Sequence, residues 1–300
     1  MKIVVAGGSG FLGEPIVKRL LTRGGDVAVL TRNPTHVRAG RPVQWDGKSQ
    51  GAWSGEAAAA DVIVNLAGEN VGEGRWTDER KKRMVASRLD ATHALVEALR
   101  RDPSRPRTMI NASAVGYYGN RGDELLDESS TRGGGFLAEL VERWEAAARE
   151  AESLARLVLL RFGVVLDAEG GALKKMALPF KLGAGGPIGN GTQWMSWIDR
   201  DDAVRMVEWA IDRESARGIY NATSPQPVRN RDFARALGHA LHRPAILPTP
   251  AFALRLAFGQ MAEEVLIAGQ RVVPRRAEEE GFAFERPGLD AALAHELGSD

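Results

Sequence analysis

A glycine-rich turn close to the N-terminus constrains the fold of this chain more than any other feature. The sequence GGSGFLG follows the β-branched run KIVVAGG (2–8) and leads into a segment whose apolar residues have helical spacing (13–24). A second strand pattern, DVAVLTRN, follows at 26–33. Strand, helix and strand within about 30 residues predict a βαβ unit.

The three glycines of this turn have the spacing of a dinucleotide-binding fingerprint. Gly7 permits the tight turn, Gly10 lets the backbone approach a pyrophosphate, and Gly13 allows the helix to pack closely on the strand. The N-terminus of the helix behind them favours anionic phosphates. A glycine triplet alone also fits an ordinary strand-to-helix turn, but its place after the first strand of a βαβ unit indicates dinucleotide binding.

The type of dinucleotide is decided at the end of the second strand. An NAD site has an Asp or Glu there to bind the ribose 2′-hydroxyl, whereas this chain has Thr31 and Arg32. Because Arg32 can pair with a 2′-phosphate and Thr31 can offer a hydroxyl, the expected cofactor is NADP(H). The alternative is a solvated arginine that merely follows a strand.

Strand and helix patterns continue to alternate along the chain. Strands are predicted at 60–70, 107–115, 155–166 and 218–223, and amphipathic helices at 77–101, with Thr77 as its cap, and at 136–148. The alternation predicts an α/β fold, a doubly wound parallel sheet of Rossmann type with helices on both faces.

The same patterns predict how the chain is divided. We expect an NADP-binding Rossmann domain over 1–167 and a substrate-side region over 168–300, which is interleaved with the sheet through 198–223. The alternation weakens past about residue 167, where glycines crowd into a loop. From 243 onward short helices and turns predict a small, mostly helical C-terminal subdomain (about 245–297), a candidate substrate lid.

Composition argues against several classes of function. The 40 Lys and Arg and 39 Asp and Glu give a formal charge of +1 without a long block of like charges, so no nucleic-acid partner is expected. No apolar run approaches a membrane span and the N-terminus lacks signal-peptide features, so a cytoplasmic location is expected. Without cysteine, and with five histidines that lack metal-binding spacing, no metal site is expected.

Several longer strings together resemble one protein family. GGSGFLG, NLAGEN and NASAVGYYG are similar to the extended, sugar-nucleotide-epimerase-like form of the short-chain dehydrogenase/reductase superfamily. Further strings narrow the match: AGENVGEGRWTDERKKRMVASRLDATHAL (67–95), FLAELVERWEAAA (136–148), RFGVVL (161–166), LPFKLGAGGPIGNG (178–191) and GQRVVPRRAEEEGFAF (269–284). As a set they resemble the YfcH-like epimerase family, whose C-terminal piece is a domain of unknown function. The resemblance covers nearly the whole chain.

The resemblance implies a set of cofactor contacts. It assigns the pyrophosphate to Gly7, Gly10, Phe11, Leu12 and Gly13, the 2′-phosphate to Thr31 and Arg32, and the adenosine to the neighbourhood of Leu66 and Ala67. It also suggests a cofactor contact for Arg88 in the helix that follows. On spacing alone, an exposed helix arginine explains Arg88 about as well.

The catalytic residues of the superfamily match this chain only in part. The resemblance aligns Ser113 with the serine that hydrogen-bonds a substrate oxygen, although such serines also cap turns. Superfamily members add a Tyr-x-x-x-Lys pair, in which the lysine lowers the pKa of the phenol. Where this pair is expected, GGGFLAELVERWE (133–145) has Phe136 and Leu140 instead.

No other placement of the pair is available. The tyrosines are Tyr117, Tyr118 and Tyr220, none has a lysine four residues later, and no lysine lies between 82 and 174. Proton transfer would then fall to Tyr117 or Tyr118 without assistance, or to Glu139 or Glu142 on the 136–148 helix, where Trp144 is expected to pack. In WMSWIDRDDAV, which resembles a stretch that closes the substrate side, we expect Asp202 rather than Asp201 to cap the next helix.

Two functions fit these patterns best. The first is an NADP(H)-dependent oxidoreductase or epimerase for a small or nucleotide-linked substrate, with Ser113 polarising an oxygen and a tyrosine or bound water handling the proton. The second is a non-catalytic NADP(H) sensor or scaffold that has kept the cleft. A structural protein with a vestigial turn fits less well. Analogy with superfamily members that pair through two long helices suggests a homodimer through 77–101 and 136–150.

Overall fold

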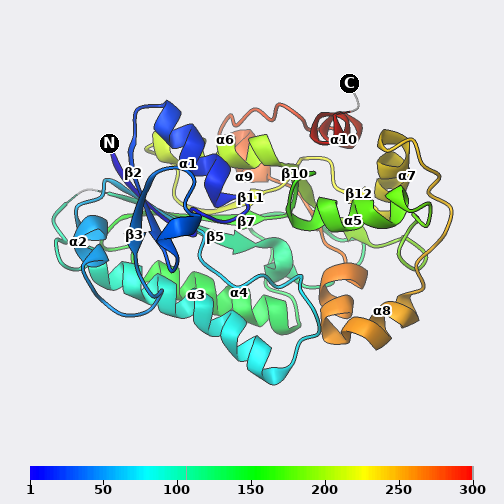
Figure 1. The fold of residues 1–300 in the computed structure, drawn as a ribbon, viewed down its shortest axis with the longest axis horizontal. Helices are drawn as coiled ribbons and strands as arrows, with labels where there is room; N and C mark the ends of the chain where they lie inside the picture. Colours follow the sequence, from blue (N-terminus) through cyan, green and yellow to red (C-terminus); the bar gives the residue numbers. More distant parts are fainter. Residues whose placement is uncertain (106, 299–300) are drawn as a thin grey trace.

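The computed structural model describes residues 1–105 and 107–298, and a seven-stranded sheet lies at its centre (Figure 1). The sheet has the order β11-β7-β5-β4-β1-β2-β3, and every neighbouring pair is parallel. Its strands are β1 (Lys2–Ala6), β2 (Asp26–Thr31), β3 (Arg41–Gln44), β4 (Val62–Asn65), β5 (Thr108–Ala114), β7 (Arg156–Phe162) and β11 (Gly218–Ala222). The strand order reverses between β1 and β4, which is where open α/β sheets bind ligands.

Helices cover both faces of this sheet, as the alternating pattern predicted (Figure 1). One face carries α1 (Gly13–Thr22), α6 (Arg200–Asp212) and the short α9 (Arg275–Glu279). The other carries α2 (Trp53–Ala58), α3 (Asp78–Leu99) and α4 (Phe136–Arg149). Successive β1 residues alternate between the two cores, because strand side chains alternate in direction. The predicted doubly wound α/β fold is confirmed.

The C-terminal part adds short helices and two-stranded pairs around a core of its own, which contains Trp197, Phe233 and Leu293. Its helices are α5 (Gly171–Lys181), α7 (Asn230–Ala240), α8 (Ala251–Phe258), the π-helix η3 (Ala262–Ile267) and α10 (Leu289–Leu297). The pairs are β8 (Val164–Leu166) with β10 (Trp197–Asp199), β9 (Trp194–Met195) with β12 (Val228–Arg229), and β6 (Leu125–Leu126) with β13 (Arg271–Val272). Two 3₁₀ turns, η1 (Pro34–His36) and η2 (Val115–Tyr118), follow β2 and β5.

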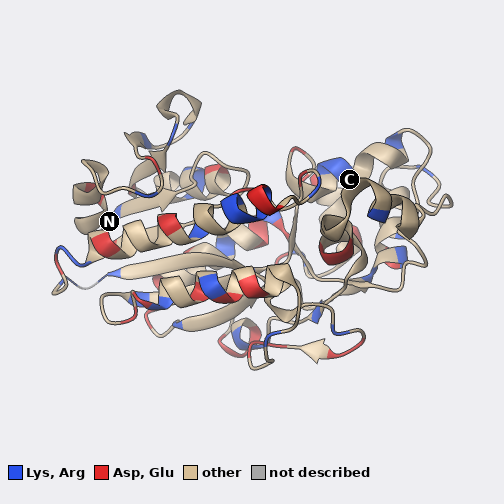
Figure 2. Ribbon diagram, turned by 90° about the horizontal axis from the view of Figure 1, so that it is seen from below, with Lys and Arg blue, Asp and Glu red and all other residues tan. Residues whose placement is uncertain are grey.

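Acidic and basic residues are interspersed along the helices on the side seen in Figure 2. The helix predicted over 77–101 begins as expected, since the Thr77 hydroxyl accepts a hydrogen bond from the Arg80 N–H. None of the helices within the described residues is long and apolar enough to cross a bilayer.

The strand predicted over 155–166 is interrupted at Gly163. A Cβ at this position would lie 2.6 Å from the Ser196 carbonyl oxygen. The chain therefore divides there into β7, which joins the main sheet, and β8, which pairs with β10.

Candidate cofactor and active site

The turn between β1 and α1 requires glycine at two positions, Gly7 and Gly13. Gly7 has φ +79°, and a Cβ on it would lie 2.9 Å from the Leu66 carbonyl carbon. A Cβ on Gly13 would lie 2.2 Å from the Gly7 carbonyl oxygen, whereas one on Gly10 would meet that oxygen at 3.1 Å. The helix begins at Leu12 without a side-chain cap. Its N-terminal end therefore keeps the features of a phosphate-binding turn.

The residues that follow β4 lie against this turn. Leu66 and Ala67 provide the atoms that a Cβ on Gly7 would meet first, and their contact with adenosine stays a prediction. Below them, Asn65 accepts a hydrogen bond from the Ala67 N–H at 3.2 Å and donates one to Asn111 Oδ1 at 2.6 Å. This buried amide pair joins the ends of β4 and β5 beneath the turn.

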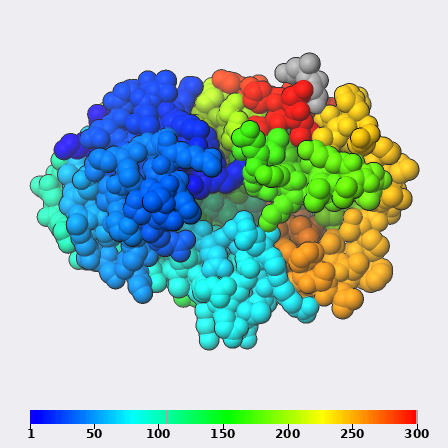
Figure 3. Space-filling view, in the orientation of Figure 1, coloured from blue at the N-terminus to red at the C-terminus, as the bar shows by residue number. Residues whose placement is uncertain are grey.

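Phe11 connects the turn to the C-terminal part of the chain. Its ring is 38% exposed and lies so close to the start of α5 that a Cβ on Gly170 or Gly171 would approach it to 2.6 or 2.7 Å. Leu12 packs partly against the core beneath α1. Figure 3 shows a hollow between the blue N-terminal region, the cyan segment around the start of α3, and the green α5.

At the end of β2, Thr31 and Arg32 differ in their freedom to bind a ligand. Thr31 is 6% exposed, and its hydroxyl donates to the Asn33 carbonyl and accepts from the Asn33 N–H, both at 3.1 Å. Arg32 is exposed, and its guanidinium has no hydrogen bond or ion pair with any described residue. Arg32 is therefore the residue at this strand end that is free to pair with an anion.

Arg88 is a half-buried residue of α3, not the exposed helix arginine that spacing alone allowed. Its Nη1 donates to the Glu69 carbonyl at 3.0 Å and to the Met84 carbonyl at 3.1 Å, and its guanidinium lies against Gly68 and 5.1 Å from the Trp144 ring centroid. Burial lowers its pKa to about 10. Its Nε is buried without a protein partner, which leaves one donor available beside the loop that follows β4.

At the end of β5, Ser113 belongs to a buried polar network. Its hydroxyl donates to Glu145 Oε1 at 2.6 Å, and Arg161 binds the same carboxylate from Nε at 2.7 Å and from Nη2 at 2.8 Å. Burial disfavours the charge on Arg161, but the hydrogen bonds and charges of Glu145 and Tyr118 together outweigh this effect and raise the pKa of the guanidinium. With its proton directed to Glu145, the buried Ser113 hydroxyl oxygen is left to act as a hydrogen-bond acceptor.

The two candidate tyrosines have different surroundings. Tyr118 is fully buried, and its hydroxyl donates to Asn221 Oδ1 at 2.8 Å and accepts from Arg161 Nη1 at 3.0 Å. Burial raises the pKa of Tyr118 to about 12. Tyr117 is half-buried, its ring centroid lies 3.5 Å from Arg161 Cζ, and its hydroxyl makes no hydrogen bond with the described part of the chain. The structure thus leaves Tyr117, and not Tyr118, with a free phenol.

The start of α4, where the Tyr-x-x-x-Lys pair was expected, is apolar, and its N-terminus is capped. The Phe136 ring packs edge-on against Trp76 at 5.3 Å, and Leu140 is buried. The Phe136 and Leu137 N–H groups donate to the Glu264 carboxylate at 3.1 and 2.8 Å. A side chain from η3 therefore closes the helix N-terminus.

The acids proposed on α4 as proton acceptors point away from Ser113. Glu139 and Glu142 are exposed, and Glu142 pairs with Arg132 at 3.0 Å. The inward acid is Glu145, which sequence reasoning missed. It follows the apolar residues Leu137 and Val141 at intervals of four, so helical periodicity is the signal that could have found it. Trp144 packs as predicted, with its Nε1 donating to Thr92 at 3.1 Å.

The expectation that Asp202 caps α6 was wrong. Asp199 is the cap, because its carboxylate accepts from the N–H groups of Asp201 and Asp202. Asp202 lies inside the first turn, where its carboxylate accepts from the N–H groups of Glu285 and Arg286, both at 2.9 Å. Asp202 therefore links the segment at Glu285 and Arg286 to α6 by hydrogen bonds.

A second cavity, of about 680 Å³, lies on the C-terminal side and was not foreseen. Its lining includes Asp123, Trp194, Arg229, Arg231 and Arg255. Trp194 lies beneath the Arg229 guanidinium at 4.2 Å and donates from Nε1 to Asp123 at 2.9 Å. These side chains come from distant segments of the chain, so no local sequence motif predicts the cavity.

Known protein families match most of this chain. The model of the NAD dependent epimerase/dehydratase family matches residues 3–223. The chain belongs to this family. A second model, a domain of unknown function termed DUF1731, matches residues 249–296. The resemblance drawn from the sequence motifs is thus confirmed, including its C-terminal piece.

Relatives within the family are similar over nearly the whole chain. The epimerase family protein Mb2239 of Mycobacterium bovis is 39% identical, with 98% of this chain and 96% of the relative covered. The human epimerase family protein SDR39U1 is 37% identical, with 98% of each covered.

Solved structures agree with this family membership. The crystal structure of human SDR39U1 (isoform 2) with NADPH has a TM-score of 0.90 and 35% identity, and the similarity covers 100% of both chains. A nucleoside-diphosphate sugar epimerase from Corynebacterium glutamicum has a TM-score of 0.82 and 33% identity, and covers 100% of this chain and 59% of that one.

Proposed function

We propose that this chain is an NADP(H)-dependent oxidoreductase or epimerase in which Tyr117 handles the proton that the missing Tyr-x-x-x-Lys pair would otherwise transfer. The single observation that carries this proposal is the contrast between the two neighbouring tyrosines. The Tyr118 hydroxyl is buried between Asn221 and Arg161, whereas the Tyr117 hydroxyl has no partner among the described residues. Only Tyr117 is free to bind a substrate oxygen.

The residues present fit the cofactor. A Cβ at Gly7 or Gly13 would collide with backbone, so the turn keeps the close approach that a pyrophosphate needs. Arg32 supplies an unpaired guanidinium for a 2′-phosphate, and Arg88 a buried unpaired Nε. The NADPH bound to human SDR39U1 supports the same assignment. When bound, NADP(H) supplies or accepts the hydride.

Arg161 takes the position of the cation that a proton-transferring phenol needs. Its guanidinium carbon lies 3.5 Å from the Tyr117 ring centroid and is held there by both oxygens of Glu145. A cation fixed next to the ring stabilises a transition state in which the phenolic oxygen gains negative charge. Ser113, with its proton held by Glu145, accepts a hydrogen bond from a substrate hydroxyl and orients it.

The substrate that fits the second cavity is an anionic one, such as a nucleotide-linked sugar. Three arginines line this cavity, and only Arg229 and Arg255 pair there with acids, Asp123 and Glu263. A second guanidinium, from Arg271, stacks on Trp194 at 4.6 Å. The excess of positive charge favours phosphate or carboxylate groups.

The test compares Tyr117→Phe with wild type in two measurements. NADPH affinity is measured by fluorescence titration, and turnover by NADPH oxidation against carbonyl compounds and by isomerisation of nucleotide sugars. We expect unchanged affinity and a turnover reduced by about 10²-fold or more, the usual contribution of general acid–base catalysis. A variant that turns over as fast as wild type would contradict the role of Tyr117.

A non-catalytic NADP(H) sensor is the second candidate, and one observation favours it. Ser113, Glu145, Arg161 and Tyr118 bind one another, so most of the polar groups at the end of β5 are already satisfied. A sensor binds NADPH, converts no substrate of the panel, and captures a partner protein whose affinity differs between NADPH and NADP⁺. Turnover of any panel compound excludes this candidate.

A further inference from the structure

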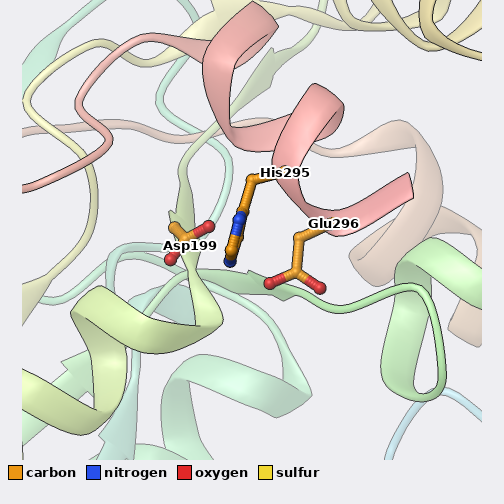
Figure 4. A group of neighbouring side chains, drawn as sticks. All are labelled: Asp199, His295 and Glu296. Atoms are coloured by element: carbon orange, nitrogen blue, oxygen red, sulfur yellow. The ribbon is translucent and has the colours of Figure 1, made fainter. Parts of the chain in front are cut away.

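Three side chains that commonly ligate metals meet where α10 packs on the junction of β10 and α6. Asp199 comes from the end of β10, and His295 and Glu296 are consecutive residues of α10. One potential ligand atom of each lies within 4.8 Å of the others. Figure 4 shows the His295 ring between the two carboxylates.

Two carboxylate oxygens of this cluster are buried without a donor. Asp199 is 0% exposed, and its Oδ1 accepts hydrogen bonds from backbone N–H groups and Arg286, while its Oδ2 has no partner. Glu296 repeats this arrangement, with Oε2 accepting from the Ala168 N–H at 3.3 Å and Oε1 buried and unpaired. Buried carboxylate oxygens normally accept hydrogen bonds or bind a cation, so each of these lacks a partner.

The charges around the cluster do not balance. Four carboxylates face two guanidiniums: Asp167, Asp199, Asp201 and Glu296 against Arg200 and Arg286. Arg286 also lies 3.9 Å from Glu285, so acidic groups outnumber basic ones around the cluster.

We propose that Asp199, His295 and Glu296 bind a divalent transition metal ion, with zinc as the best match. Imidazole nitrogen and carboxylate oxygen are both donors that zinc accepts, and three of them leave the fourth position open to water. Asp201 Oδ2 lies 3.1 Å from His295 Nε2, which places a third carboxylate beside the imidazole. The ion ties the C-terminal helix to α6, so its role is to hold the C-terminal region in place.

The experiment uses the full chain after removal of metals with EDTA. Zinc chloride is titrated in a calorimeter at pH 7.5, and thermal unfolding is followed with and without zinc. We expect one ion per chain and a melting temperature that rises with zinc concentration. His295→Gln and Glu296→Gln reduce zinc affinity at least 10-fold, whereas His239→Gln, on the exposed side of α7, leaves it unchanged.

Three outcomes would overturn the site. They are no saturable zinc binding by wild type, equal binding by His295→Gln, and stability that responds to pH between 6 and 8 but not to zinc, which indicates a shared proton instead. If the variants fail to fold, wild type alone decides. Zinc then shifts the NMR signals of one imidazole among the five histidines, and a spectrum without such a shift contradicts the proposal.

Discussion

The Ser113 hydroxyl donates a 2.6 Å hydrogen bond to Glu145 Oε1, and this contact fixes which way the serine proton points. The carboxylate is held in turn by two hydrogen bonds from Arg161. The Ser113 oxygen can therefore accept a further hydrogen bond, while its proton stays with Glu145. Ser113 was expected to polarise a substrate oxygen, whereas this geometry favours accepting a hydrogen bond from a substrate hydroxyl.

Glu145→Gln is expected to destabilise the fold strongly. The substitution leaves the guanidinium of Arg161, which is 1% exposed, without its counter-charge, and breaking a buried pair in this way costs about 3–5 kcal/mol. Ser113→Ala removes one hydrogen bond and costs about 1 kcal/mol. The free energy of unfolding is measured in urea, with Glu142→Gln on the exposed side of α4 as the control. An effect of Glu145→Gln no larger than that of the control refutes the network's importance.

The network also predicts a loss of stability at high pH. The pKa of Tyr118 is raised from 10 to about 12 in the fold, so between these values the native state keeps a proton that the unfolded chain has released. Stability therefore falls as pH rises through this window, by roughly 1.4 kcal/mol per pH unit for each such group. Tyr220, whose pKa burial also raises to about 12, adds a similar slope. Arg88, whose pKa burial lowers to about 10, contributes a slope of opposite sign over the same window. In urea unfolding between pH 10 and 12, the stability of Tyr118→Phe should therefore fall less steeply with pH than that of wild type, and an identical slope would count against the assignment.

The glycine turn was predictable from the sequence because its three glycines form a local pattern. Gly7, Gly10 and Gly13 lie within seven residues, and the collisions at Gly10 and Gly13 come from the same turn, although that at Gly7 comes from Leu66. The polar network was not predictable, since Ser113, Glu145 and Arg161 come from three elements that only the folded sheet brings together. Glu139 and Glu142 were named and Glu145 was missed, although its spacing from Leu137 and Val141 places it on the apolar face of α4.

The difference between local patterns and contacts formed only in the fold also explains why the cap of α6 and the proposed metal ligands were not predicted. The sequence IDRDDAV offers three acids within four positions, and local pattern cannot tell which of them precedes the first helical turn. Asp199 occupies that position because β10 ends there. His295 and Glu296 lie almost one hundred residues later, so histidine spacing gave no indication of a cluster with Asp199.

Alanine at two positions of the turn should separate folding from cofactor binding. In Gly13→Ala the new Cβ lies 2.2 Å from the Gly7 carbonyl oxygen, so the backbone must move, at a cost of about 1–3 kcal/mol or more. In Gly10→Ala the single contact is at 3.1 Å, so the fold is kept while the Cβ blocks the pyrophosphate approach. Melting temperature and NADPH titration check this, and normal NADPH affinity in Gly10→Ala would show that the turn does not hold the cofactor.

Glu264 is expected to stabilise α4 by binding its N-terminus. Its carboxylate accepts from the Phe136 and Leu137 N–H groups, and a negative charge in this position contributes about 1 kcal/mol. Glu264→Gln should lower the free energy of unfolding by about that amount. Its neighbour Glu263, which is exposed and pairs with Arg255, provides the matched control Glu263→Gln. Equal effects of the two substitutions would remove the special role of Glu264.

The most direct measurement for the account as a whole is the affinity of Arg32→Ala for NADPH and for NADH. Arg32 is exposed and unpaired among the described residues, so its one proposed role is to pair with the 2′-phosphate. Loss of a charge-assisted hydrogen bond, about 1.5–3 kcal/mol, raises the dissociation constant of NADPH by about 10–100-fold and leaves that of NADH unchanged. The control is Arg23→Ala, which removes an arginine at the C-terminal end of α1, away from the glycine turn. If wild type binds NADH as tightly as NADPH, or if Arg32→Ala weakens both equally, the assignment of NADP(H) to this cleft is contradicted.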